Sequence, residues 1–168
     1  TVDLTKLDEA AIAALGIGRK FQKPTAFDSR SVRDNIVLAL AGWREPGSAL
    51  FRRETAAQTE RIDELLRTIR LTEKASWPAS KLSHGQKQWL EIGMVMLNDP
   101  RLVLLDEPTA GMTAAETAET ADLIRRVFAG RTAVIIEHDV SFVRRLGTRV
   151  SVLHRGRVMR EGSFSEIA

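Results

Sequence analysis

The fold of this chain is decided by the stretch Leu102-Val103-Leu104-Leu105-Asp106-Glu107-Pro108. Four apolar residues in a row, followed by a turn-forming segment, are typical of a strand buried in a parallel sheet. Two adjacent carboxylates come directly after this strand. Because ligands gather at the carboxyl ends of parallel strands, Asp106 and Glu107 are candidate functional residues. The alternative is that this acidic pair only caps the next turn.

Two more apolar runs follow, at Thr132–Ile136 and Val150–Leu153, and helical segments separate the runs. This alternation is typical of parallel strands that are covered on both faces. The chain from about residue 100 onward is therefore predicted to be α/β. A hairpin around Arg155-Gly156 is expected to finish it.

The upstream part, about residues 27 to 98, is predicted to be mostly helical, because apolar residues recur there at helical spacing. Gly42 to Arg53 contains turn-forming residues and is the candidate flexible segment between the first two helices. Ser31 with Asp34, and Thr113 with Glu116, have the spacing of helix caps. The apolar stripes of the four expected helices, in chain order, are Val32, Ile36 and Leu40; Ile62, Leu65, Leu66 and Ile69; Trp89, Leu90, Met94 and Leu97; and Leu123, Ile124, Val127 and Phe128.

The composition fits one globular domain, with 43% of the 168 residues hydrophobic and 28% charged. The chain has no cysteine, which excludes disulfides, thiolate zinc sites and a thiol nucleophile. No apolar run approaches the roughly 20 residues of a membrane-spanning helix, so a membrane role must come through a partner. The net charge is only +3 and the basic pairs are scattered, which indicates solvated helix faces rather than a nucleic-acid patch.

Three other stretches carry residues suited to phosphate chemistry. Leu82-Ser83-His84-Gly85-Gln86 stands directly before an expected buried helix, where Ser83 can cap the helix and the first-turn amides attract anions. Ile135-Ile136-Glu137-His138-Asp139 is a strand that ends in a histidine, and Phe21-Gln22 ends a short strand that runs into a loop. Each stretch alone has an ordinary structural explanation, since a lone histidine is more often a surface or core residue. Their joint presence, in this order, is far more specific.

With these motifs the chain resembles the ATPase subunits of ABC transporters throughout its length. Gln22 matches the Q-loop, Leu82 to Gln86 the signature sequence, Leu102 to Glu107 the Walker B strand, and His138 the switch histidine. The resemblance implies an α/β fold: a P-loop NTPase-like ABC ATPase core, with a parallel sheet and helices, plus a helical signature subdomain. The expected parts are 1–26 for the core leading to the Q-loop, 27–98 for the signature subdomain, and 99–168 for the rest of the core.

The resemblance also implies a division of labour around ATP and Mg²⁺. Asp106 is expected on the metal side, because Mg²⁺ prefers carboxylate and phosphate oxygens, and Gln22 is expected to sense the metal and the terminal phosphate. Glu107 is the candidate base for the attacking water, and His138 is expected to contact that water or the γ-phosphate. The signature residues are expected to meet the γ-phosphate of ATP held by a second ABC ATPase subunit in a head-to-tail dimer; they are Ser83, His84, Gly85 and Gln86.

The sequence departs from the family at the main phosphate cradle. The P-loop pattern Gly-x-x-x-x-Gly-Lys-Ser/Thr, also called Walker A, occurs nowhere, and there is no tyrosine to stack on adenine as is usual in this family. In the family both features precede the region that begins here with Thr1. We therefore expect that a segment with the P-loop and its antiparallel strands is missing, and that the chain alone neither binds ATP tightly nor hydrolyses it. Exposed sheet edges and apolar surface should then favour association.

Two longer stretches, Leu82 to Gly93 and Asp106 to Thr113, are most similar to bacterial uptake systems for branched-chain amino acids and, more closely, urea. This implies transmembrane permease subunits as partners, a solute-binding protein indirectly, and a peripheral place at the cytoplasmic face of the bacterial inner membrane. Nucleic acid is not an expected partner. Two alternatives stay open: a soluble ABC ATPase of DNA repair or translation, and a non-catalytic structural fragment.

Overall fold

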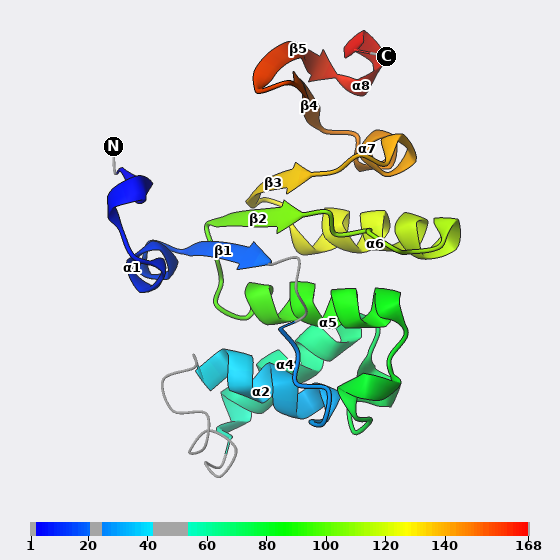
Figure 1. Ribbon diagram of the computed structural model, residues 1–168. Helices are drawn as coiled ribbons and strands as arrows, with labels where there is room; N and C mark the ends of the chain where they lie inside the picture. Colours follow the sequence, from blue (N-terminus) through cyan, green and yellow to red (C-terminus); the bar gives the residue numbers. More distant parts are fainter. Residues whose placement is uncertain (1–2, 21–24, 42–53, 168) are drawn as a thin grey trace.

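The computed structural model describes residues 3–20, 25–41 and 54–167 (Figure 1). Helices and strands alternate irregularly along the chain, with two strands paired as a hairpin near the end. The elements are η1 Leu4–Lys6, α1 Glu9–Ala14, β1 Ile17–Lys20, α2 Val32–Ala41, α4 Ala56–Thr68, η2 Thr72–Lys74, η3 Ala79–Lys81, α5 His84–Met96, β2 Leu102–Asp106, α6 Ala114–Val127, β3 Thr132–Ile136, α7 Val140–Leu146, β4 Arg149–His154, β5 Arg157–Ser163 and α8 Phe164–Ile167.

A three-stranded parallel sheet in the order β1-β2-β3 forms the centre of the molecule. Its registers pair Ile17 with Leu102 and Leu102 with Thr132, so all three strands run in the same direction and end at the same edge. One face of the sheet is packed by α5, α6 and α7 through a buried apolar cluster. The buried members of that cluster are Ile92, Met96, Val103, Leu105, Ala121, Ile124, Phe128, Phe142 and Leu146. The α/β prediction for this region is confirmed.

Helix α5 lies between the sheet and the helical part that α2 and α4 build (Figure 1). Its Trp89, Leu90 and Met94 belong to the core of the helical part, while Ile92 and Met96 belong to the sheet core. An α-helix that is apolar on several sides buries several sides, and here both cores draw on the same helix. The predicted deep burial of this helix is confirmed, and α5 joins the two halves of the molecule.

The helices begin where the sequence places their caps. The Ser31 hydroxyl accepts from the Asp34 amide at 3.0 Å, and the Asp34 carboxylate accepts from the Ser31 amide at 3.2 Å. Full capping boxes also start α5 at Ser83 and α6 at Thr113. The predicted stripes are buried, except that Leu40, Leu65 and Val127 are only partly so. The segment expected to be flexible, 42–53, lies outside the described residues.

The prediction for the third apolar run is wrong. The run Val150–Leu153 lies in β4, which pairs antiparallel with β5 as the predicted hairpin and takes no part in the parallel sheet. Covering on both faces is also wrong for β3, because Val134 and Ile136 on its second face are exposed. An apolar run shows that a strand can be buried but does not show which strand pairs with it. Within the described ranges β3 has only β2 as a neighbour.

No helix within the described ranges has both the length and the apolar character that a membrane span requires.

The open face of β3 should make the chain associate as its concentration rises, because exposed apolar side chains and an unpaired strand edge favour pairing with another copy. Replacing Val134 or Ile136 by Lys should shift sedimentation velocity profiles toward the monomer. Thr132→Lys is the matched control, since it adds the same charge to the same face of β3 without removing an apolar side chain. Profiles that do not depend on concentration, or on Val134 and Ile136, would contradict this reading.

Candidate functional site

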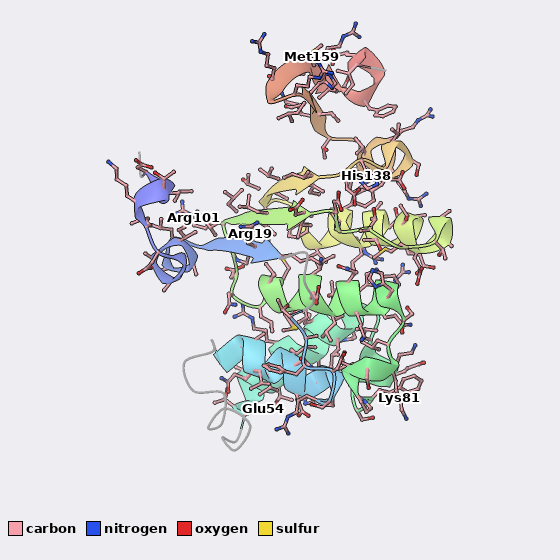
Figure 2. The ribbon with its side chains drawn as sticks, viewed as in Figure 1. Arg19, Glu54, Lys81, Arg101, His138 and Met159 are labelled. Atoms are coloured by element: carbon pink, nitrogen blue, oxygen red, sulfur yellow. The ribbon has the colours of Figure 1, made fainter. Side chains whose placement is uncertain are left out.

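The parallel pairing of β2 with β3 brings the predicted Walker B acids beside the predicted switch histidine. Asp106 is paired with Ile136 at the end of both strands, and the Glu107 amide donates to the Ile136 carbonyl at 2.9 Å. Glu107 then turns the chain away with φ +46, in the left-handed region. His138 follows β3 by two residues, where the chain leads into α7 (Figure 2). Asp106, Glu107 and His138 therefore lie at one edge of the sheet.

Glu107 and His138 form an open acid–base pair. His138 Nδ1 lies 3.6 Å from Glu107 Oε1, and the two side chains are 78% and 42% exposed, with the histidine the more exposed. A carboxylate in that position can accept a proton from water, and an imidazole beside it can donate or accept one hydrogen bond on each ring nitrogen. The pair is thus placed to act on a molecule that approaches the strand ends from solvent.

The donor chemistry of Asp106 fits a magnesium ion that arrives with a nucleotide. Its carboxylate is half-buried at the last position of β2. No group of three or more His, Cys, Asp or Glu side chains in the described ranges is arranged to hold a metal ion by itself. Mg²⁺ commonly takes one or two carboxylates and completes its shell with water and phosphate oxygens, so a single strand-end Asp is a sufficient protein ligand.

The signature residues form a second group, at the start of α5. The Ser83 hydroxyl accepts from the Gln86 amide at 3.3 Å, and Gln86 Oε1 accepts from the Ser83 amide at 3.1 Å and from Lys74 Nζ at 2.9 Å. His84 Nε2 contacts the Ala110 carbonyl oxygen at 2.8 Å. Among the described residues, no hydrogen bond or ion pair joins this group to Asp106, Glu107 or His138. The contact of His84 with Ala110, in the turn that follows Glu107, is the link between the two groups that the described residues show.

Glu116 closes over the start of α5, and sequence reasoning assigned it only a capping role. Its Oε1 accepts from the Ser83 hydroxyl at 3.3 Å, and a Cβ atom added at Gly85 would lie 2.9 Å from the same oxygen. The Thr113 amide and hydroxyl lower the pKa of Glu116, and bonds from Ser83 and the Gly85 amide add to this effect. The Glu116 carboxylate thus binds the Ser83 hydroxyl and the Gly85 amide at a helix start that was predicted to attract an anion.

Gln22, the predicted Q-loop residue, lies outside the described residues, but both flanks of its segment are described. Lys20 Nζ before it lies 3.6 Å from Glu91 Oε2, and the Thr25 amide after it donates to Glu91 Oε1 at 2.8 Å. The Lys20 and Glu91 side chains are only 2% and 4% exposed. Sequence reasoning missed Glu91, although a carboxylate among the apolar residues of a buried helix was a usable signal.

The chain is similar to ATP-binding proteins of ABC transporters. A family model described as "ABC transporter" matches residues 2–110. The methionine import ATP-binding protein MetN of Leifsonia xyli is 37% identical in an alignment of 171 positions that covers 98% of this chain and 47% of that protein. The high-affinity branched-chain amino acid transport ATP-binding protein LivG of Salmonella typhimurium is 32% identical in an alignment of 165 positions that covers 93% of this chain and 65% of that protein.

The chain therefore spans between about half and two thirds of the length of these curated relatives. A solved ATP-binding cassette of an ABC transporter superposes with a TM-score of 0.83 at 26% identity, covering 98% of this chain and 68% of that one. The same cassette in its ADP conformation gives a TM-score of 0.78 at 25% identity. The parallel sheet and its packed helices are thus the fold of an ATP-binding cassette.

The buried pair of Lys20 and Glu91 gives a test of the link between β1 and α5. Glu91→Leu should lower the free energy of unfolding by about 3–5 kcal/mol, because it leaves a buried ammonium without this carboxylate. The double variant Lys20→Met with Glu91→Leu should recover much of that loss. Urea denaturation of wild type, Lys20→Met, Glu91→Leu and the double variant measures the coupling energy between the two side chains. Strictly additive losses would show that the two charges do not interact.

Glu116 gives a test in acid. A carboxyl whose folded pKa lies below its usual value of 4.5 stabilises the fold above that pH, and the contribution is lost as pH falls through the folded pKa. Glu116→Gln keeps a capping-box side chain but cannot titrate. Wild type should therefore be slightly more stable than Glu116→Gln near pH 7, and the difference should vanish in acid. Urea midpoints across the pH range measure it, with the exposed Glu119→Gln on the same helix as control. A difference that does not change with pH would overturn this assignment.

Proposed function

This chain belongs to the ABC transporter ATP-binding family, and from that premise we propose that it forms part of a subunit that binds and hydrolyses ATP to energise an importer of a small polar solute. The observation that carries the proposal is the strand-end group: Asp106 is the last residue of β2, Glu107 follows it directly, and His138 Nδ1 lies 3.6 Å from Glu107 Oε1. Phosphoryl transfer depends mainly on positioning and charge stabilisation, which residues from adjacent strand ends can supply together.

Each residue has a distinct part in the proposed reaction. The Asp106 carboxylate would hold the Mg²⁺ of Mg-ATP, and that ion would neutralise charge at the phosphates. The Glu107 carboxylate orients the attacking water and accepts its proton. His138 donates a hydrogen bond to the γ-phosphate or to that water and so keeps the geometry of attack. Gln22 would sense the metal and the terminal phosphate.

The start of α5 serves a second ABC ATPase subunit in this proposal. Ser83, His84, Gly85 and Gln86 would meet the γ-phosphate of ATP held by the partner. Among the described residues no hydrogen bond or ion pair joins them directly to Glu107 or His138, which is compatible with an action on a different nucleotide. The Ser83 hydroxyl and the Gly85 amide now bind the Glu116 carboxylate, so this carboxylate must move aside when a phosphate arrives.

The helical part is the proposed docking surface for permease subunits. We divide the chain into core at 1–26, signature subdomain at 27–98 and further core at 99–168. Phe27 and Trp77 are exposed aromatic residues of the middle part, and Lys74 Nζ lies 5.0 Å from the Trp77 ring centroid. Aromatic side chains with a charged neighbour are common at protein interfaces. A subunit held by a permease in this way, with a solute-binding protein beyond it, would be peripheral at the cytoplasmic face of the inner membrane.

The proposal also concerns the identity of the transported solute. The relatives named above import methionine or branched-chain amino acids by their names, which favours an amino acid. The stretches Leu82 to Gly93 and Asp106 to Thr113 resemble urea systems, which keeps urea as the second candidate. Because no residue of an ATPase site touches the solute, uptake assays with the cognate permease decide between the two.

The isolated chain should bind Mg-ATP more weakly than micromolar and show no turnover, because the sequence contains no Walker A pattern to hold the phosphates against Asp106 and Glu107. Isothermal titration measures the affinity. Joining the chain to an N-terminal segment with a Walker A sequence, taken from an ABC transporter ATPase, should give ATPase activity. Glu107→Gln in that fusion should lower kcat by about 10²–10⁴-fold.

Glu119→Gln is the control for that fusion, since it removes an exposed carboxylate from α6. A fusion that binds ATP and retains full turnover as Glu107→Gln would defeat the proposed role. A fusion that binds ATP but never hydrolyses it would instead support a non-catalytic part for this chain.

A further inference from the structure

Glu137 is a buried carboxylate between the last residue of β3 and His138. Its side chain is only 1% exposed, and it accepts three hydrogen bonds. Oε1 accepts from the Thr109 amide at 2.9 Å and from the Thr109 hydroxyl at 2.5 Å. Oε2 accepts from the His138 amide at 3.1 Å. A buried charge is unfavourable unless hydrogen bonds compensate for it. A carboxylate buried at the end of an apolar strand is therefore a candidate for a specific role.

The residue that Glu137 binds belongs to the turn that follows Glu107. Glu107 has φ +46, a region that residues other than glycine adopt only when their surroundings hold them there. The turn closes with the Ala110 amide donating to the Glu107 carbonyl at 3.2 Å and the Met112 amide donating to the Thr109 carbonyl at 3.1 Å. Thr109 is 6% exposed at the middle of this turn. A bond to Thr109 therefore stabilises the conformation that aims Glu107.

The backbone pairing of β2 with β3 ends where the loops after these two strands begin. The last bond between the two strand ends runs from the Glu107 amide to the Ile136 carbonyl. Beyond it, within the described ranges, the hydrogen bonds between the loop after β2 and the loop after β3 are those of Glu137 with Thr109. The same carboxylate also binds the His138 amide. One side chain thus connects the two loops that carry the acid–base pair.

We propose that Glu137 is a positioning residue that fixes the distance between Glu107 and His138. The inference rests on the proposed ATPase function and adds a residue to that site. Glu137 does not itself act as the base, because its carboxylate is closed to solvent and both its oxygens accept hydrogen bonds from the chain. Its effect reaches the reaction through the Thr109 turn and through His138, whose amide donates to Glu137 Oε2 and whose Nδ1 lies 3.8 Å from the same oxygen.

The first test uses the chain as it stands. Backbone amide hydrogen exchange, followed by NMR, should become about tenfold faster at Thr109 and His138 in Glu137→Ala, since about 1.4 kcal/mol of local stabilisation corresponds to tenfold. The Glu107 amide should exchange faster as well, although it keeps its own acceptor on Ile136. Amides of the β4–β5 hairpin are the internal control and should not change. Unchanged exchange at Glu107 and His138 would overturn the inference, whatever the function of the protein.

The second test separates positioning from stability in the fusion that carries a Walker A segment. Glu137→Ala and Thr109→Val should each lower kcat by about 10- to 100-fold with KM nearly unchanged, because misplacing Glu107 affects the reaction more than binding. Thr109→Ser restores the hydroxyl and should recover most of kcat. The two losses should not add in the double variant, because both variants break the same contact.

A loss of kcat that Thr109→Ser does not recover, or losses that add, would refute positioning by this contact. A wild-type fusion that binds ATP without hydrolysing it would count against the proposed function alone, because the exchange measurement would still decide what Glu137 does to the two loops.

Discussion

The parallel pairing of β2 with β3 is the constraint on which the rest of the site depends. It pairs Asp106 with Ile136, which are the last residues of β2 and β3. Both strands therefore end at the same level, at the same end of the sheet. A slip of the register by one residue would exchange the faces to which the side chains point. Glu107 after β2 and His138 after β3 lie 3.6 Å apart in this register, and the buried Val103 and Leu105 of β2 stabilise it.

Helix α5 connects the parallel sheet with the helical part of the molecule. It contributes to the helical core and to the sheet core, and its Glu91 binds Lys20 at the end of β1. Its capped start binds Glu116 of α6, and His84 contacts the turn after Glu107 through the Ala110 carbonyl. A helix that is held at its start, along its sides and by a buried ion pair cannot shift without disturbing every neighbour. The signature residues and the strand ends are therefore connected although they lie apart.

Local patterns in the sequence predicted most of the fold. The capping residues Ser31, Ser83 and Thr113 start helices as expected, and the run Thr132–Ile136 is a strand with the predicted bounds. The partner of Val150–Leu153 was not predictable, because pairing is a tertiary property. Glu91, Glu116 and Glu137 act through contacts with residues far along the chain, which no spacing rule reveals. The placement of Asp106, Glu107 and His138 at neighbouring strand ends was predictable, because parallel strands end at the same side of a sheet.

The central claim is that Mg-ATP meets this chain at Asp106, Glu107 and His138. Paramagnetic broadening of NMR signals by Mn²⁺-ATP tests it most directly, because the method locates even a weakly bound ion. The amide signals of these three residues should broaden first in the isolated chain, and Asp106→Asn should remove the effect. Broadening that centres instead on the hollow lined by Arg144, Thr148 and Phe164, or that spreads evenly over the chain, would contradict the account.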